Sequence, residues 1–243
     1  MSSSDLVDPL GLYAAAMDTS DYAATVVPII RVMAPSFGNL LDIGAGGGQL
    51  GHALCAPAIP WTAIEPSPLM RQRLERLRPP PDIAAAGWEE ADVAPASHDL
   101  VLAATMPALF DKPEAFLARC KAWARKAVVW VVPAQEGPKG LILAGCLPRE
   151  WHGEDETPGI EITLSRLPKA FHPERMTVVH WTFAAVVPAI APIAEFLADR
   201  LLWAKDDQRR PDLRAHLTRQ SKPDPAGRRL EIARKSAILT WSV

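Results

Sequence analysis

The residues best suited to bind a ligand lie between Leu40 and Gly51. An apolar run, Leu40 to Ile43, is short enough to be a buried strand of a parallel sheet and contains one acid, Asp42. Five glycines follow within eight residues, at positions 44, 46, 47, 48 and 51. Glycine is favoured where the backbone turns tightly or approaches a ligand closely, because it has no Cβ. A helix expected to begin near Gly47 would present free N–H groups, so the stretch predicts a nucleotide-binding strand–turn–helix unit.

Two ligand classes compete for these glycines. The spacing Gly-x-Gly-x-x-Gly, from Gly46 to Gly51, satisfies the dinucleotide fingerprint, which is weak alone and would indicate a NAD(P)-dependent oxidoreductase. The spacing Asp-x-Gly-x-Gly-x-Gly, from Asp42 to Gly48, also accounts for the acid. A buried carboxylate is costly without partners, and a pyrophosphate would add like charge, whereas a cationic ligand would offset it. The second frame is therefore favoured.

This second frame resembles motif I of the class I S-adenosylmethionine (AdoMet)-dependent methyltransferases, whose ligand carries an ammonium and a sulfonium. The resemblance covers roughly residues 38–132. It implies a Rossmann-like, doubly wound α/β sheet of seven strands, mostly parallel with an antiparallel edge strand, together with N-terminal helices and a helical C-terminal cap insertion. It also implies which residues seat the methionine end of the cofactor: Asp42, Gly44, Ala45, Gly46 and Gly48.

Later positions extend the resemblance to the rest of the cofactor. Glu65 ends an expected second strand 17 residues after Gly48, where an acid can accept both ribose hydroxyls; the alternative is an exposed neighbour of a helix cap. The family holds its adenine at Gly87-Trp88, where an Asp often replaces Gly87, so Trp88 either stacks on adenine or is a buried structural tryptophan. The resemblance thus implies further cofactor contacts at Glu65, Pro66, Gly87, Trp88, Glu89, Ala104 and Thr105.

The loop after the expected fourth strand lines the methyl-transfer site in this family. Here it begins Ala104-Thr105-Met106-Pro107, without the Asn/Asp-Pro-Pro-aromatic element of nucleobase amino methylases, and the chain has no Pro-Cys dipeptide for cytosine C5 chemistry. The resemblance therefore indicates a small-molecule acceptor, with S-adenosyl-L-homocysteine as the second product. A non-catalytic AdoMet-fold binding or assembly protein remains the alternative.

The flanking segments complete an expected single domain. Residues 1–37 are expected to form a helical gate, 38–135 the AdoMet-binding core and 136–243 a substrate-side half with helical insertions. Tyr13 and Tyr22 lie in the gate and can face the sulfonium or pack in the core, since an aromatic face stabilises a cation by about 0.5–2 kcal/mol. His152 is the candidate general base.

Composition narrows the function classes. A net charge of −2 argues against a surface devoted to nucleic acid, and three widely spaced cysteines offer no metal-ligand spacing. No signal peptide or run of ~18 apolar residues is seen, so a cytoplasmic protein without membrane contact is expected.

Overall fold

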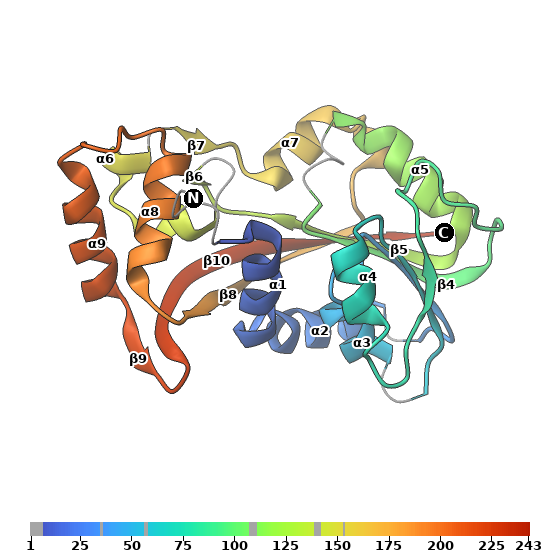
Figure 1. The fold of residues 1–243 in the computed structure, drawn as a ribbon. Helices are drawn as coiled ribbons and strands as arrows, with labels where there is room; N and C mark the ends of the chain where they lie inside the picture. Colours follow the sequence, from blue (N-terminus) through green and yellow to red (C-terminus); the bar gives the residue numbers. More distant parts are fainter. Residues whose placement is uncertain (1–6, 35, 56–57, 107–110, 139–141, 153) are drawn as a thin grey trace. The chain divides into compact units, whose positions relative to one another are not determined.

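The structure, a computed structural model, describes residues 7–34, 36–55, 58–106, 111–138, 142–152 and 154–243. The chain divides into two compact units (Figure 1). The core unit comprises the described parts of residues 22–135, 158–181 and 235–243, and the helical unit those of residues 1–21, 136–157 and 182–234.

One eight-stranded sheet has the order β3-β2-β1-β4-β5-β10-β8, with β9 paired to β10. Its strands are β1 (Leu40–Ile43), β2 (Trp61–Ile64), β3 (Asp82–Ala84), β4 (His98–Ala104), β5 (Ala124–Pro133), β8 (Arg175–Val187), β9 (Lys222–Asp224) and β10 (Gly227–Ser242). The pairs among β1 to β5 are parallel, whereas β10 is antiparallel to β5. The predicted Rossmann-like sheet, mostly parallel with an antiparallel strand near one edge, is confirmed.

Helices connect these strands. They are α1 (Pro9–Thr19), α2 (Tyr22–Met33), α3 (Gln49–Cys55), α4 (Pro68–Leu74), α5 (Pro113–Trp123), α6 (Arg149–His152), α7 (Gly159–Arg166), α8 (Ile190–Arg200) and α9 (Arg209–Gln220), with 3₁₀ helices η3 (Ile142–Cys146) and η4 (Lys169–Phe171). A separate two-stranded sheet pairs β6 (Gly137–Pro138) with β7 (Asp155–Glu156). The local sequence explains where two of these helices begin. Asp8 and Ser67 accept hydrogen bonds from the first turns of α1 and α4, and each helix begins at a proline.

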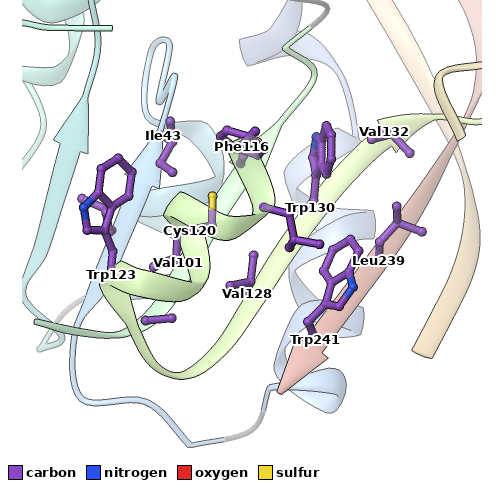
Figure 2. Packing of buried hydrophobic residues seen from close by; sticks show 14 of the residues in the cluster. Ile43, Val101, Phe116, Cys120, Trp123, Val128, Trp130, Val132, Leu239 and Trp241 are labelled. Carbon is purple, nitrogen blue, oxygen red and sulfur yellow. The ribbon is translucent and has the colours of Figure 1, made fainter. Parts of the chain in front are cut away.

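The main core of the sheet lies under helix α5. Figure 2 shows Phe116 and Cys120 of this helix among strand side chains that include Val101, Val128 and Trp130, all of them buried. Leu41 and Ile43 belong to the same cluster. Because side chains alternate along a strand, Asp42 faces away from α5 and toward the other side of the sheet. The motif acid is therefore separated from the main core by its own strand.

The sheet has one strand more than the seven that the resemblance implied. Helix α5 ends at Trp123, because Ala124 already begins β5. The eighth strand comes from the hairpin of β9 and β10. Gly227 makes this possible: its φ is +137°, and a Cβ there would lie 2.3 Å from the carbonyl oxygen of Val187. Among the described residues from 137 to 152, the chain forms the short strand β6, η3 and α6.

Candidate functional site

The glycine loop between β1 and α3 has the geometry that its composition predicts. Gly44, Gly46 and Gly48 have φ values of +62°, +55° and +85°, the left-handed region that residues with a Cβ rarely adopt. The amides of Gly44 and Ala45 both donate to the carbonyl oxygen of Ile64, at 2.8 and 3.2 Å, which ties the loop to the end of β2. A Cβ on Gly46 would meet no atom within 4 Å, so the loop is open at this glycine.

Glu65 is fixed beside that opening. One carboxylate oxygen (Oε2) accepts a hydrogen bond from the amide of Gly46 at 2.8 Å, and the other (Oε1) accepts one from the amide of Ser67 at 2.8 Å. The residue is 6% exposed, and its own amide donates to Ala84 in β3. Because each carboxylate oxygen has two lone-pair sites, both oxygens keep acceptor capacity for a ligand. The carboxylate is thus held at the carboxyl ends of β1 and β2.

Asp42 is buried on the α3 side of the same sheet. It is 3% exposed, and burial raises its pKa from 3.8 to about 8; a backbone hydrogen bond from Gly51 opposes this rise, and the charge of Glu65 adds to it. A Cβ on Gly51 would lie 2.7 Å from Oδ2 of Asp42 and 2.4 Å from the Trp61 ring. Gly51 therefore serves close packing of α3 on the sheet, and Asp42 points toward that helix.

The segment after β4 lies against the glycine loop. The amide of Thr105 donates to the carbonyl of Val131 at 3.0 Å, one residue beyond the end of β4 at Ala104. Thr105 has a φ of +54°, which is strained for a β-branched residue. A Cβ on Gly44 would lie 2.2 Å from the sulfur of Met106, so the Met106 side chain rests directly on this glycine. The resemblance implied a cofactor contact for Thr105 and placed Met106 in the loop that lines the methyl-transfer site, but the contact of Met106 with Gly44 was not predicted.

The predicted adenine segment is a turn in the core unit. Trp88 is half-buried, and its ring meets Phe116 edge to face at a centroid distance of 5.3 Å. The carbonyl of Gly87 accepts from the amide of Ala91 at 3.0 Å. Glu89 is exposed and forms an ion pair with Lys112 at 2.9 Å. Trp88 therefore contributes to core packing, while its contact with adenine stays a prediction.

The two tyrosines and Pro66, also predicted to contact the cofactor, are divided between the two units. Tyr22 is 2% exposed in the core unit, with its ring centroid 4.6 Å from that of Trp181. Tyr13 is in the helical unit and stacks on Phe183 at 6.2 Å. Both tyrosines have the packing contacts of the alternative interpretation, and their cofactor contacts stay predictions. Pro66 is exposed, and its carbonyl accepts from Nη1 of Arg71 at 2.6 Å.

The candidate general base belongs to the helical unit. His152 is the last residue of α6, and its side chain lies outside the described residues. Sequence reasoning also missed Ser67 and Arg71, which hold the Glu65–Pro66 turn through backbone contacts. Ser67-Pro68 is a sequence pattern typical of a helix start, and it carries no signal that the Ser67 amide holds the acid.

No group of three or more possible metal ligands occurs among the residues that the structure describes. The cysteines are free, and burial raises the pKa of the Cys55 thiol to about 12. None of the described helices has the length and apolar character needed to cross a membrane.

Comparison with known proteins agrees with this geometry. Residues 41–131 match the family model of a methyltransferase domain. A solved structure of a proposed type II methyltransferase from Anaeromyxobacter dehalogenans is 18% identical, with a TM-score of 0.58 over 89% of this chain and 94% of that one. A proposed methyltransferase from Bacillus halodurans is 12% identical, with a TM-score of 0.53 over 89% and 97% of the two chains.

A third structure, of a proposed methyltransferase from an antibiotic biosynthesis pathway of Anabaena variabilis, is 16% identical, with a TM-score of 0.53 over 89% of this chain and 96% of that one. None of the curated proteins matches the sequence. Residues 41–131 thus match a methyltransferase domain, and the solved structures share the fold of this chain. The resemblance indicated by the Asp42–Gly48 frame is confirmed over this segment, and the match supports AdoMet as the cofactor.

Proposed function

We propose that this chain transfers the methyl group of AdoMet to a small-molecule acceptor. The observation that supports this function best is the pairing of the open glycine at position 46 with the Glu65 carboxylate, 2.8 Å from its amide. In open α/β sheets, ligands bind outside the carboxyl ends of the strands, which is where this pair lies. The acceptor is proposed to be small because the loop from Ala104 lacks both nucleobase signals.

Each part of the site is proposed to contact one part of the cofactor. The stretch from Asp42 to Gly48, with Gly44, Ala45 and Gly46, would seat the methionine end, and Glu65 with Pro66 would hold the ribose. Gly87, Trp88 and Glu89 would border the adenine, and Ala104 and Thr105 the methyl group. Tyr13 and Tyr22 are retained as proposed gate residues, although both pack against aromatic neighbours.

The chemistry asks little of the protein beyond orientation. When bound, the cofactor supplies a methyl group already activated by the sulfonium. The site residues then hold the nucleophile in line with that methyl, and orientation of this kind can contribute about 7–11 kcal/mol. A general base is needed only for an acceptor that is a poor nucleophile at neutral pH, and His152 is proposed for that role. Residues 1–37, 38–135 and 136–243 are proposed as gate, cofactor-binding core and substrate-side half.

Calorimetric titration of the purified chain with AdoMet, S-adenosylhomocysteine and NADH tests the proposal. We expect micromolar binding of the first two and none of NADH. Binding of NADH alone would mean that the glycines from 46 to 51 form a dinucleotide site. Binding of S-adenosylhomocysteine without methyl transfer to any acceptor in a broad panel would favour the non-catalytic alternative.

A further inference from the structure

Glu65 is held through its backbone as well as its side chain, and helix α4 takes part in both. The amide of Glu65 donates to Ala84 of β3, and its Oε2 atom accepts from the amide of Gly46. Its other carboxylate oxygen accepts from the amide of Ser67, which caps α4. Its carbonyl oxygen accepts from Nη1 of Arg71, a residue within α4, at 3.1 Å. The start of this helix therefore fixes both the carboxylate and the main chain of the acid.

One nitrogen atom of Arg71 serves two neighbouring carbonyl groups. The Nη1 atom that donates to the carbonyl oxygen of Glu65 also donates to that of Pro66, at 2.6 Å. Both carbonyl groups thus point toward one guanidinium, although like ends of two dipoles repel each other. Hydrogen bonds from a charged donor are roughly twice as strong as those between neutral groups, so the guanidinium offsets this repulsion. The conformation of the turn at residues 65 and 66 depends on this cation.

Helix α4 is itself held in place by packing. Met70 and Leu74 of the helix are buried. A Cβ on Gly48 would lie 2.8 Å from Cδ2 of Leu74 and 2.7 Å from Cδ1 of Leu77, so this segment also rests on the glycine loop. Because the apolar side chains anchor α4, the half-buried Arg71 reaches the turn from a fixed base. The acid and the glycine loop are therefore positioned by the same helix.

We propose that Arg71 is a positioning residue for cofactor binding, which acts by holding the Glu65 carboxylate in the orientation that accepts the ribose hydroxyls. The strength of a hydrogen bond depends steeply on its geometry, so an acid that serves two adjacent hydroxyls must be oriented before the ligand arrives. The nature of the ligand rests on the proposed function, whereas the control of Glu65 by Arg71 does not.

The competing interpretation gives Arg71 a structural role alone. Its loss would then destabilise α4, and any effect on binding would not pass through the carboxylate of Glu65. The two interpretations differ once that carboxylate is removed. In E65A a positioning residue has nothing left to position, so a second substitution at Arg71 should add little. A residue that acts by another route would weaken binding by the same factor in both backgrounds.

Calorimetric titration with S-adenosylhomocysteine, on variants shown to be folded by circular dichroism, makes this comparison. R71M keeps an unbranched side chain without donors, and we expect it to bind about fivefold more weakly or worse. R71K should retain most of the affinity, because one charged nitrogen serves both carbonyl groups. In the E65A background, R71M should change the affinity by less than about twofold. R76M is the matched control, since Arg76 is exposed and lies just beyond the end of α4; its affinity should equal that of the wild type.

Hydrogen exchange tests the positioning without any ligand. The amides of Gly46 and Ser67 both donate to the Glu65 carboxylate at 2.8 Å, so they should exchange faster in R71M and at the wild-type rate in R76M. The proposal is overturned if R71M binds S-adenosylhomocysteine as wild type does, if it loses the same factor in E65A, or if exchange of both amides is unchanged. If wild type does not bind S-adenosylhomocysteine but these amides exchange faster in R71M, the proposed function is wrong and the positioning role stands.

Discussion

Buried carboxylates have different partners at the two ends of the parallel strands in the core unit. At the amino end of β4, Asp99 accepts from the Gly38 amide at 2.7 Å and lies 2.7 Å from Nε of Arg125 and 2.9 Å from Nζ of Lys126. Asn39 reinforces this end, because its Oδ1 accepts from both the Asp99 amide and Arg125. These cations and the amide hold the pKa of Asp99 well below its usual range.

At the carboxyl end, neither acid has an ion-pair partner among the residues that the structure describes. Burial raises the pKa of Asp42 to about 8, and Glu65 is held by backbone amides. The amino end, with its ion pairs, joins neighbouring strands and stabilises the sheet. The carboxyl end, beside the glycine loop, keeps two buried acids without cations, which is costly. The difference teaches that acids without cationic partners lie at the end of the sheet where we propose that the cofactor binds.

The largest expected effect is the pH dependence of stability caused by Asp42. Its folded-state pKa of about 8 lies above its reference value of 3.8, so the folded protein binds more protons than the unfolded chain between these values. Stability should fall as pH rises through this window, on the order of 1 kcal/mol per pH unit, and level off above it. D42N should lack this component in urea unfolding. If the unfolding free energies of wild type and D42N changed with pH in the same way, Asp42 would be ionised in the folded protein across this pH range.

Removing the second acid should weaken cofactor binding, in addition to the stability lost with its two backbone hydrogen bonds. E65A deletes a carboxylate expected to accept two hydrogen bonds from the ribose, so S-adenosylhomocysteine should bind at least about tenfold more weakly by calorimetry. E65Q, which keeps one acceptor, should lose less. An unchanged affinity in folded E65A would remove the ribose assignment.

Removing the charge of Asp99 should lower stability and leave cofactor binding unchanged. D99N loses an ion-pair cluster that includes two exposed cations, so we expect a loss of about 1–2 kcal/mol of unfolding free energy at neutral pH. Because the folded-state pKa lies below the unfolded value of 3.8, this contribution is present above that pH and disappears as pH falls further. Binding of S-adenosylhomocysteine should not change. Weaker binding of S-adenosylhomocysteine by D99N would contradict the assignment of stability to the amino end and of binding to the carboxyl end.

The smallest effects should come from two strained residues, one at each end. Ala96, before β4, and Thr105, after it, have φ values of +46° and +54°. Glycine relieves this strain, so A96G and T105G should each stabilise the protein by about 1 kcal/mol or less in thermal unfolding. Only T105G should alter the affinity for S-adenosylhomocysteine. Equal binding by both variants would place Thr105 outside the cofactor site.

Sequence reasoning recovered the parts of this fold that depend on local chemistry. The glycines and the buried β1 predicted the strand–turn–helix unit, and the family resemblance carried by these residues implied the sheet. It could not recover elements set by tertiary contact: the β9–β10 hairpin depends on the approach of Val187 to Gly227. The orientation of Asp42 toward Gly51 and the contact of Met106 with Gly44 are likewise long-range.

The glycine loop also has a consequence for how this chain can vary. Within the protein, Gly46 is limited by its backbone angle, since its φ is +55° and a Cβ there would meet no protein atom within 4 Å. Because the proposed cofactor approaches at this point, a side chain on residue 46 should weaken cofactor binding more than it affects folding. Substitution at Gly51 is limited by volume, because Trp61 and Asp42 occupy the place of any Cβ. The glycine that completes the dinucleotide fingerprint is therefore required by packing whichever nucleotide binds. Its presence carries no information about cofactor identity, and mutational libraries aimed at the cofactor should leave it fixed.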